Sequence, residues 1–219
     1  MTDPHLSGRP ADAQDPYFFH SYGHVPAQPG APRAPDERQQ SFHDLLSQFV
    51  MQLSTHPGTS PVGFLDRRMP LGGEWRKHLK EALATCRVFM PVYSQRYATS
   101  RWCGMEWDAF ARRQEVHQRF APYTVSPIVP VLWTPPARVT LPDVVLPYQY
   151  HHQDLGEDYR RMGLLGLMEA GKWPSYRRTV WRIAERVVDV ATTARWRPCD
   201  ASLFDDLRNV FAPGDQEDT

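Results

Sequence analysis

The residues with the clearest chemical potential are Trp102 and Glu106, which stand four positions apart in the segment SRWCGMEW. Ser100 is a good helix-capping residue, so the spacing predicts a helix from about residue 100 to residue 115, with both side chains on one face. An indole can stack on a flat base, and a carboxylate can stabilise positive charge that develops at a ribose C1′. This pair suits an N-glycoside as substrate. The plainer interpretation, a core tryptophan beside a solvated helix acid, stays open from spacing alone.

The elements around this helix alternate in type along the chain. Strands are expected at residues 17–22, 61–65, 87–93 and 126–133, the last with irregular ends because of its prolines. Helices are expected near residues 42–53, 75–83 and 180–191, where apolar residues recur at helical spacing. Residues 134–171 are ambiguous, with one short strand near residues 144–148 and a short helix. The order predicts an α/β fold with a mostly parallel sheet, helices on both faces, and a site at the carboxyl ends of the strands.

Composition narrows the function classes. The 219 residues carry 25 Lys plus Arg and 25 Asp plus Glu, so no net charge favours nucleic acid or an anionic membrane as partner. Three cysteines without a CxxC motif indicate a reducing compartment and no structural zinc. The adjacent pair His151 and His152 is a weak metal candidate, and we expect no metal site. With no apolar leader and no apolar run long enough to cross a bilayer, we expect a cytoplasmic protein.

Familiar nucleotide and hydrolase motifs are missing. The chain has no GxGxxG, no GxxxxGK[ST] and no GxSxG, which argues against an ordinary dinucleotide fold, a P-loop enzyme and an α/β-hydrolase.

A longer pattern surrounds the Trp102–Glu106 pair. Residues 63–107 read GFLDRRMPLGGEWRKHLKEALATCRVFMPVYSQRYATSRWCGMEW, and the chain opens its first strand with FFHSY at residues 18–22. The positions that form the pattern are Ser21, Tyr22, Phe64, Asp66, Ser94, Tyr97, Ser100, Trp102, Cys103 and Glu106. In this order they resemble the Toll/interleukin-receptor (TIR) domain, and the phrasing of the segment is nearest to the actinobacterial TIR-like FxsC group.

The resemblance implies a flavodoxin-like TIR fold over residues 17–192, after a disordered tail at 1–16 and before a C-terminal extension at 193–219 whose end is disordered. It also implies roles for individual residues. Glu106 matches the family's catalytic glutamate, and the residues expected to bind substrate are Trp102, Tyr22, Ser21 and Asp66. The loop expected to contact a neighbouring subunit contains Arg67, Arg68, Met69, Gly72 and Gly73. Gly23 departs from active relatives that carry a basic residue there.

Three functions remain open. The first is cleavage of NAD⁺ to release nicotinamide, with NAD⁺ as substrate and no separate cofactor. Self-association through TIR surfaces would complete the site. The second is a non-catalytic interaction module in bacterial signalling or defence, paired with another TIR or sensor protein. The third is a nucleoside-processing enzyme of related architecture, for which the sequence offers no additional acid or amide.

Overall fold

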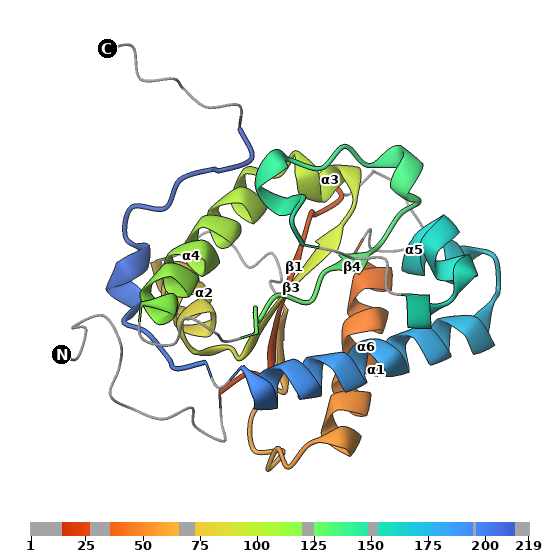
Figure 1. Cartoon of the computed structure of the whole chain (residues 1–219), viewed down its shortest axis with the longest axis horizontal. Helices are drawn as coiled ribbons and strands as arrows, with labels where there is room; N and C mark the ends of the chain where they lie inside the picture. The colour runs from red at the N-terminus through yellow and green to blue at the C-terminus, as the bar shows by residue number, and fades with distance from the viewer. Residues whose placement is uncertain are drawn as a thin grey trace.

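The computed structural model describes residues 15–26, 36–65, 73–119, 125–148, 153–194 and 196–212. Within them lies a parallel sheet in the order β2-β1-β3-β4 (Figure 1). The strands are β1 (Phe18–Tyr22), β2 (Gly63–Leu65), β3 (Val88–Tyr93) and β4 (Val131–Leu132). This confirms the α/β, flavodoxin-like fold with a parallel sheet between helices. It also brings the ends of β1 and β3, the two central strands, to one edge.

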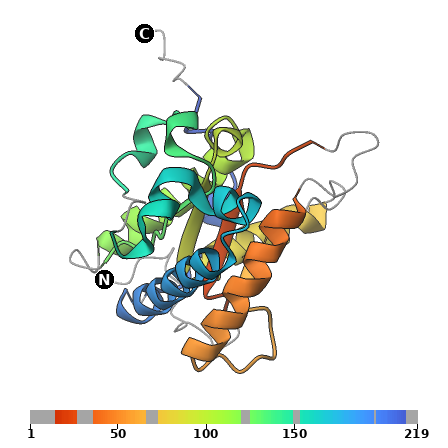
Figure 2. The same cartoon turned by 90° about the vertical axis from the view of Figure 1, so that its right-hand side faces the viewer.

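One face of the sheet is covered by the helices α1 (Glu37–Leu53) and α6 (Trp173–Thr193), which lie side by side in Figure 2. The helix α5 (Glu157–Glu169) completes this layer. Side chains alternate along a strand, so Phe18, His20 and Tyr22 point to this layer. Phe18 and Tyr22 belong to the same buried cluster as the inner stripes of α1 and α6.

The opposite face is covered by α2 (Gly73–Thr85), α3 (Gln95–Ala98) and α4 (Arg101–Gln118). Phe19 and Phe89 point into this layer and stack on Phe64 and Phe110, with ring centroids 5.1 and 4.9 Å apart. The C-terminal segment joins the same layer through η4 (Ala201–Phe204), whose Phe204 is buried. Figure 1 shows this segment running along the outside of α2 and α4.

The edge strand β4 is shorter than the predicted span of residues 126–133. Its pairing with β3 is split between a single bridge at Phe89–Ile128 and the strand proper, which starts opposite Val92. Toward β4, Phe89 donates its N–H to Pro127 O at 2.8 Å, and Tyr93 accepts from Trp133 N at 2.9 Å. Pro91 lies midway between them on that side and has no N–H to donate. The irregularity expected from prolines is confirmed, and Pro91 of the neighbouring strand contributes to it.

The strand predicted near residues 144–148 is wrong. The segment forms the 3-10 helix η2 (Asp143–Val145), preceded by η1 (Pro136–Arg138) and followed by η3 (Gln153–Leu155). Val145 is buried, but its backbone N–H donates to Pro142 O at 3.0 Å, and Tyr148 N donates to Val145 O at 3.1 Å. The backbone groups of this segment thus form hydrogen bonds within local turns, although its strand-forming side chains predicted pairing with a neighbouring strand.

The predicted helices are confirmed, with longer bounds. α6 begins at Trp173, with Pro174 in its first turn, and α1 begins at Glu37. The short helix α3 was not predicted. Within the described residues, no helix is both long and apolar enough to cross a membrane.

Candidate active site

The centre of the candidate site joins β1 to α4. Glu106 is 3% exposed, Ser21 is fully buried, and the Ser21 hydroxyl donates a hydrogen bond to Glu106 Oε2. The two residues are 85 positions apart in sequence. A carboxylate buried between a helix and a sheet needs such a donor, because an unpaired buried charge is costly. The fold therefore brings together two of the predicted site residues at the carboxyl edge of the sheet.

Two serine caps set the angle of this helix. Ser94 accepts from Tyr97 N at 3.1 Å and starts α3, and Ser100 accepts from Cys103 N at 3.3 Å and starts α4. The Ser-x-x-Tyr-x-x-Ser spacing thus produces two consecutive helix starts directly after β3. This turn of the chain directs Glu106, in the second turn of α4, toward Ser21.

Tyr97 lies beside the Ser21–Glu106 pair. Its side chain is fully buried, and burial raises the pKa of Tyr97 well above its usual value. Negative charge on the nearby Cys103, Tyr93 or Glu106 would raise this pKa further. The phenol stays neutral and forms an uncharged wall of the site.

Gly23 has a structural reason to lack a side chain. A Cβ at this position would lie 2.3 Å from both Arg96 C and Tyr97 N, which are backbone atoms of α3. The close approach of β1's end to α3 leaves no room for the basic residue that some active relatives carry here. The departure at Gly23 is thus a consequence of how α3 packs.

Tyr22 points to the other face of the sheet and belongs to a small polar cluster with His24 and Asp36. His24 Nδ1 lies 2.7 Å from Asp36 Oδ2, and the Tyr22 hydroxyl donates to the same oxygen at 3.3 Å. Val25 N donates to Asp36 Oδ1 at 3.3 Å. Burial alone would raise the pKa of Asp36, but its bonds to His24, Val25 and Tyr22 outweigh burial and lower it. Sequence reasoning missed Asp36, which stands at the N-cap position of α1 but makes its side-chain bonds to Tyr22, His24 and Val25 instead of capping the helix.

Trp102 meets different neighbours from Glu106. It is 37% exposed and lines a hollow of about 320 Å³ between α2, α4 and η4. The other lining residues are Leu79, Lys80, Leu83, Arg101, Met105, Phe204, Asp205, Asp206 and Leu207. Residues four apart on a helix are a full turn apart along its axis. In this conformation Trp102 lines the hollow beside α2, whereas Glu106 contacts Ser21 of β1. The substrate-binding role of Trp102 therefore stays a prediction.

Several predicted residues lie outside the described part of the chain. They are Asp66, Arg67, Arg68, Met69 and Gly72, together with His151 and His152. Gly73 is described as the first residue of α2. No group of three or more possible metal ligands occurs among the described residues. Cys103 is buried in the core. Cys86 is buried as well, and burial raises the pKa of its thiol to about 11.

A comparison with protein families places these features in context. The family model for the TIR domain matches residues 40–161, more than half of the 219 residues. The chain therefore belongs to the TIR domain family, and membership supports a role in TIR signalling. The matched span includes α4 with Glu106, whereas β1, α6 and η4 lie outside it. TIR domains generally interact through TIR–TIR contacts.

Proposed function

We propose that this TIR protein cleaves the N-glycosidic bond of NAD⁺ and that Glu106 is the catalytic carboxylate. The observation that carries the proposal is the buried Ser21–Glu106 pair at the carboxyl edge of a parallel sheet. That edge is where open α/β sheets bind ligands. A buried acid held there by a serine from a neighbouring strand is typical of a functional site more than of a solvated helix face.

The reaction asks little of the protein beyond position and one negative charge. The bond between C1′ and the nicotinamide nitrogen breaks, and nicotinamide leaves neutral with the electron pair. Positive charge develops at C1′, where the Glu106 carboxylate stabilises it. Water adds its hydroxyl to C1′ and releases one proton, which gives ADP-ribose. A ribose hydroxyl in place of water would give a cyclic product. NAD⁺ is the substrate, and the proposed step needs no separate cofactor.

The described conformation is closed at this point. Glu106 is 3% exposed and its Oε2 already accepts from Ser21, so contact with a substrate requires the carboxylate to become accessible. Ser21, Tyr22, Asp66 and Trp102 are the proposed substrate-binding residues, and self-association through Arg67, Arg68, Met69, Gly72 and Gly73 is the proposed opening event. The FxsC group remains the subgroup that we propose.

The test is nicotinamide release from NAD⁺, followed by chromatography at high protein concentration. Glu106→Gln keeps the volume and removes the charge, so we expect it to abolish release. Glu115→Gln on the same helix removes an exposed acid and serves as the matched control. Release by the wild type that Glu106→Gln leaves intact would rule out Glu106 as the catalytic group.

The closure of Glu106 also supports a second candidate, a TIR module that binds other proteins without turnover. In that case the Ser21–Glu106 bond is structural and joins α4 to β1. No nicotinamide release by the wild type, including under crowded conditions or with a partner TIR or sensor protein, would favour this function.

A further inference from the structure

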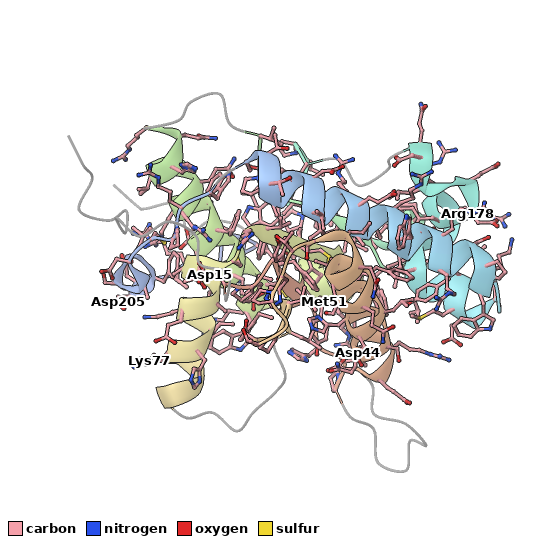
Figure 3. The ribbon with its side chains drawn as sticks, turned by 90° about the horizontal axis from the view of Figure 1, so that it is seen from below. Asp15, Asp44, Met51, Lys77, Arg178 and Asp205 are labelled. Atoms are coloured by element: carbon pink, nitrogen blue, oxygen red, sulfur yellow. The ribbon has the colours of Figure 1, made fainter. Side chains whose placement is uncertain are left out.

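The C-terminal residues 199–212 cross the outer surface of α2 and α4, and we call them the strap. Figure 1 shows the strap at the left of the molecule, and Figure 3 places Asp205 beside α2, on the opposite side from Arg178. The family match ends at residue 161, so the strap lies outside the matched region.

The first half of the strap is built into the core. Cys199 N donates to Ala84 O at 3.0 Å, and Phe204 is 1% exposed within the same cluster as Leu83 and Phe110. A buried aromatic ring anchors a segment strongly. This half is a permanent part of the fold.

The second half is held by ion pairs at the surface and by the partly buried apolar side chains of Leu207, Val210 and Phe211, which pack against the core. Lys80 Nζ lies 2.6 Å from Asp205 Oδ1, and Arg112 pairs with Asp206 while also donating to Asp206 O at 3.0 Å. The side chains of Asp205 and Asp206 are 72% and 79% exposed. Ion pairs this exposed are individually weak and screened by salt. The second half is therefore less firmly attached than the first, whose Phe204 is fully buried.

The released half would uncover the helix that carries Glu106. Arg208 N donates to Asp108 Oδ2 at 2.8 Å, and the Asn209 side chain covers Gly104 so closely that a Cβ there would lie 1.9 Å from Asn209 Oδ1. Phe211 packs against Trp107 and Tyr97, with ring centroids 6.3 and 5.4 Å away.

The contacts on α4 fall on both sides of Glu106, and Tyr97 borders the Ser21–Glu106 pair. The strap thus holds α4 from outside while Ser21 holds it from inside.

We propose that the second half of the strap, residues 205–212, is autoinhibitory and keeps α4 in the closed position where Glu106 is buried. Release of the strap loosens α4 and uncovers the face formed by Lys80, Trp102, Met105 and Arg112. The effect on catalysis rests on the proposed function, whereas the effect on α4 does not.

The experiment is hydrogen exchange of the α4 amides in the full chain, compared with nicotinamide release. The test variant is Asp205→Lys with Asp206→Lys, which places like charges against Lys80 and Arg112. The matched control is Asp154→Lys with Asp189→Lys, two exposed acids away from the strap that give the same change in charge. A rescue variant combines Asp205→Lys with Lys80→Asp, which restores that pair in reverse. It leaves Asp206 and Arg112 unchanged, because Arg112 also pairs with Asp108 at 2.9 Å.

We expect exchange at residues 104–110 to be at least tenfold faster in the test variant, unchanged within twofold in the control, and restored in the rescue. Wild-type exchange should accelerate with added salt. An unchanged exchange rate at residues 104–110 in the test variant, or an equal acceleration of exchange in α6, would overturn the proposal that the strap holds α4 closed.

The two proposals fail separately. Faster exchange in α4 without nicotinamide release from any variant would retain the strap and reject the enzyme. Nicotinamide release that is equal in wild type and test variant, with unchanged exchange, would retain the enzyme and reject the strap.

Discussion

Ser21 and Glu106 illustrate how one hydrogen bond can serve both stability and function. The bond satisfies a carboxylate that is 3% exposed, in a place where water cannot replace the donor. In the proposed reaction, the same bond occupies the oxygen that the substrate would approach. Strengthening the closed state and delaying reaction are thus one physical effect at this site.

Ser21→Ala tests the stability half of this statement. The variant leaves Glu106 without this buried donor, so we expect the free energy of unfolding to fall by about 1–3 kcal/mol. Urea denaturation at neutral pH measures the change. Ser41→Ala is the control, because the exposed Ser41 hydroxyl donates only to Glu37 O of its own helix, and a change within about 0.5 kcal/mol is expected. Equal losses in both variants would contradict the assigned role of Ser21.

His20 makes stability depend on pH. Burial lowers the pKa of His20 well below its usual value, and the neighbouring His43 lowers it further, while a bond to Gln39 raises it. The folded protein therefore holds His20 neutral at a pH where the unfolded chain binds a proton. Since the unfolded state gains more protons below about pH 6.5, stability falls as pH decreases through that value, by up to about 1.4 kcal/mol per pH unit. His56 and His117, whose pKa values are also lowered, add to the same trend.

Urea denaturation at pH 7.5, 6.5 and 5.5 measures this slope. His20→Phe removes the titrating ring but keeps an aromatic side chain beside Tyr22 and Phe42. The slope of stability against pH should therefore decrease by nearly the amount that corresponds to the uptake of one proton on unfolding. The lowered pKa of Asp36 does not affect the slope between pH 7.5 and 5.5, because the stability that Asp36 contributes is lost only near pH 4 and below. An unchanged slope in His20→Phe would show that His20 is not the source.

At the scale of elements, two glycines on either side of the candidate site respond differently to a methyl group. At Gly23 the obstacle is the backbone of Arg96 and Tyr97, which cannot move without α3. At Gly104 the nearest atom is Oδ1 of Asn209, a side chain that can turn away by giving up its hydrogen bond from Phe211 N, and Phe211 N would lie 3.2 Å from the added Cβ. Gly104→Ala also gains about 1 kcal/mol of helix propensity.

Gly23→Ala should therefore lower the free energy of unfolding by about 1–3 kcal/mol, whereas Gly104→Ala should leave it nearly unchanged. Thermal and urea denaturation of the two variants side by side decide this. A larger loss in Gly104→Ala than in Gly23→Ala would mean that the strap is the more rigid neighbour.

The sequence predicted elements well where periodicity and burial agree. α6 and α1 carry regular apolar stripes, and β1 and β3 are wholly buried runs, so their types follow from composition. The segment at residues 144–148 failed because valines favour a strand locally while its backbone bonds close within one turn. Within the site, the resemblance picked out Ser21 and Glu106. Their contact depends on strand order, which spacing alone does not encode, whereas the opposite orientation of Tyr22 follows from the alternation of side chains along β1.

At the scale of the whole molecule, catalysis and assembly should be linked. If self-association opens the closed site, nicotinamide release per protomer rises with protein concentration, so total activity increases more than linearly. Stopped assays over a hundredfold range of concentration measure this. Arg67→Glu with Arg68→Glu should remove the upward curvature, and strict proportionality in the wild type would contradict assembly-dependent activity.

The buried guanidinium of Arg113 joins three backbone carbonyls that become available at different times during synthesis. Arg113 is fully buried in α4 and donates to Leu83 O at 2.8 Å, to Cys86 O at 2.7 Å and to Arg197 O at 3.0 Å. The first two acceptors precede Arg113 on the nascent chain, but the third emerges from the ribosome 84 residues later. Until then a charged group in the core lacks one acceptor, although domains tend to begin folding from the N-terminus. The three hydrogen bonds are thus complete only when the segment after α6 has packed against α4.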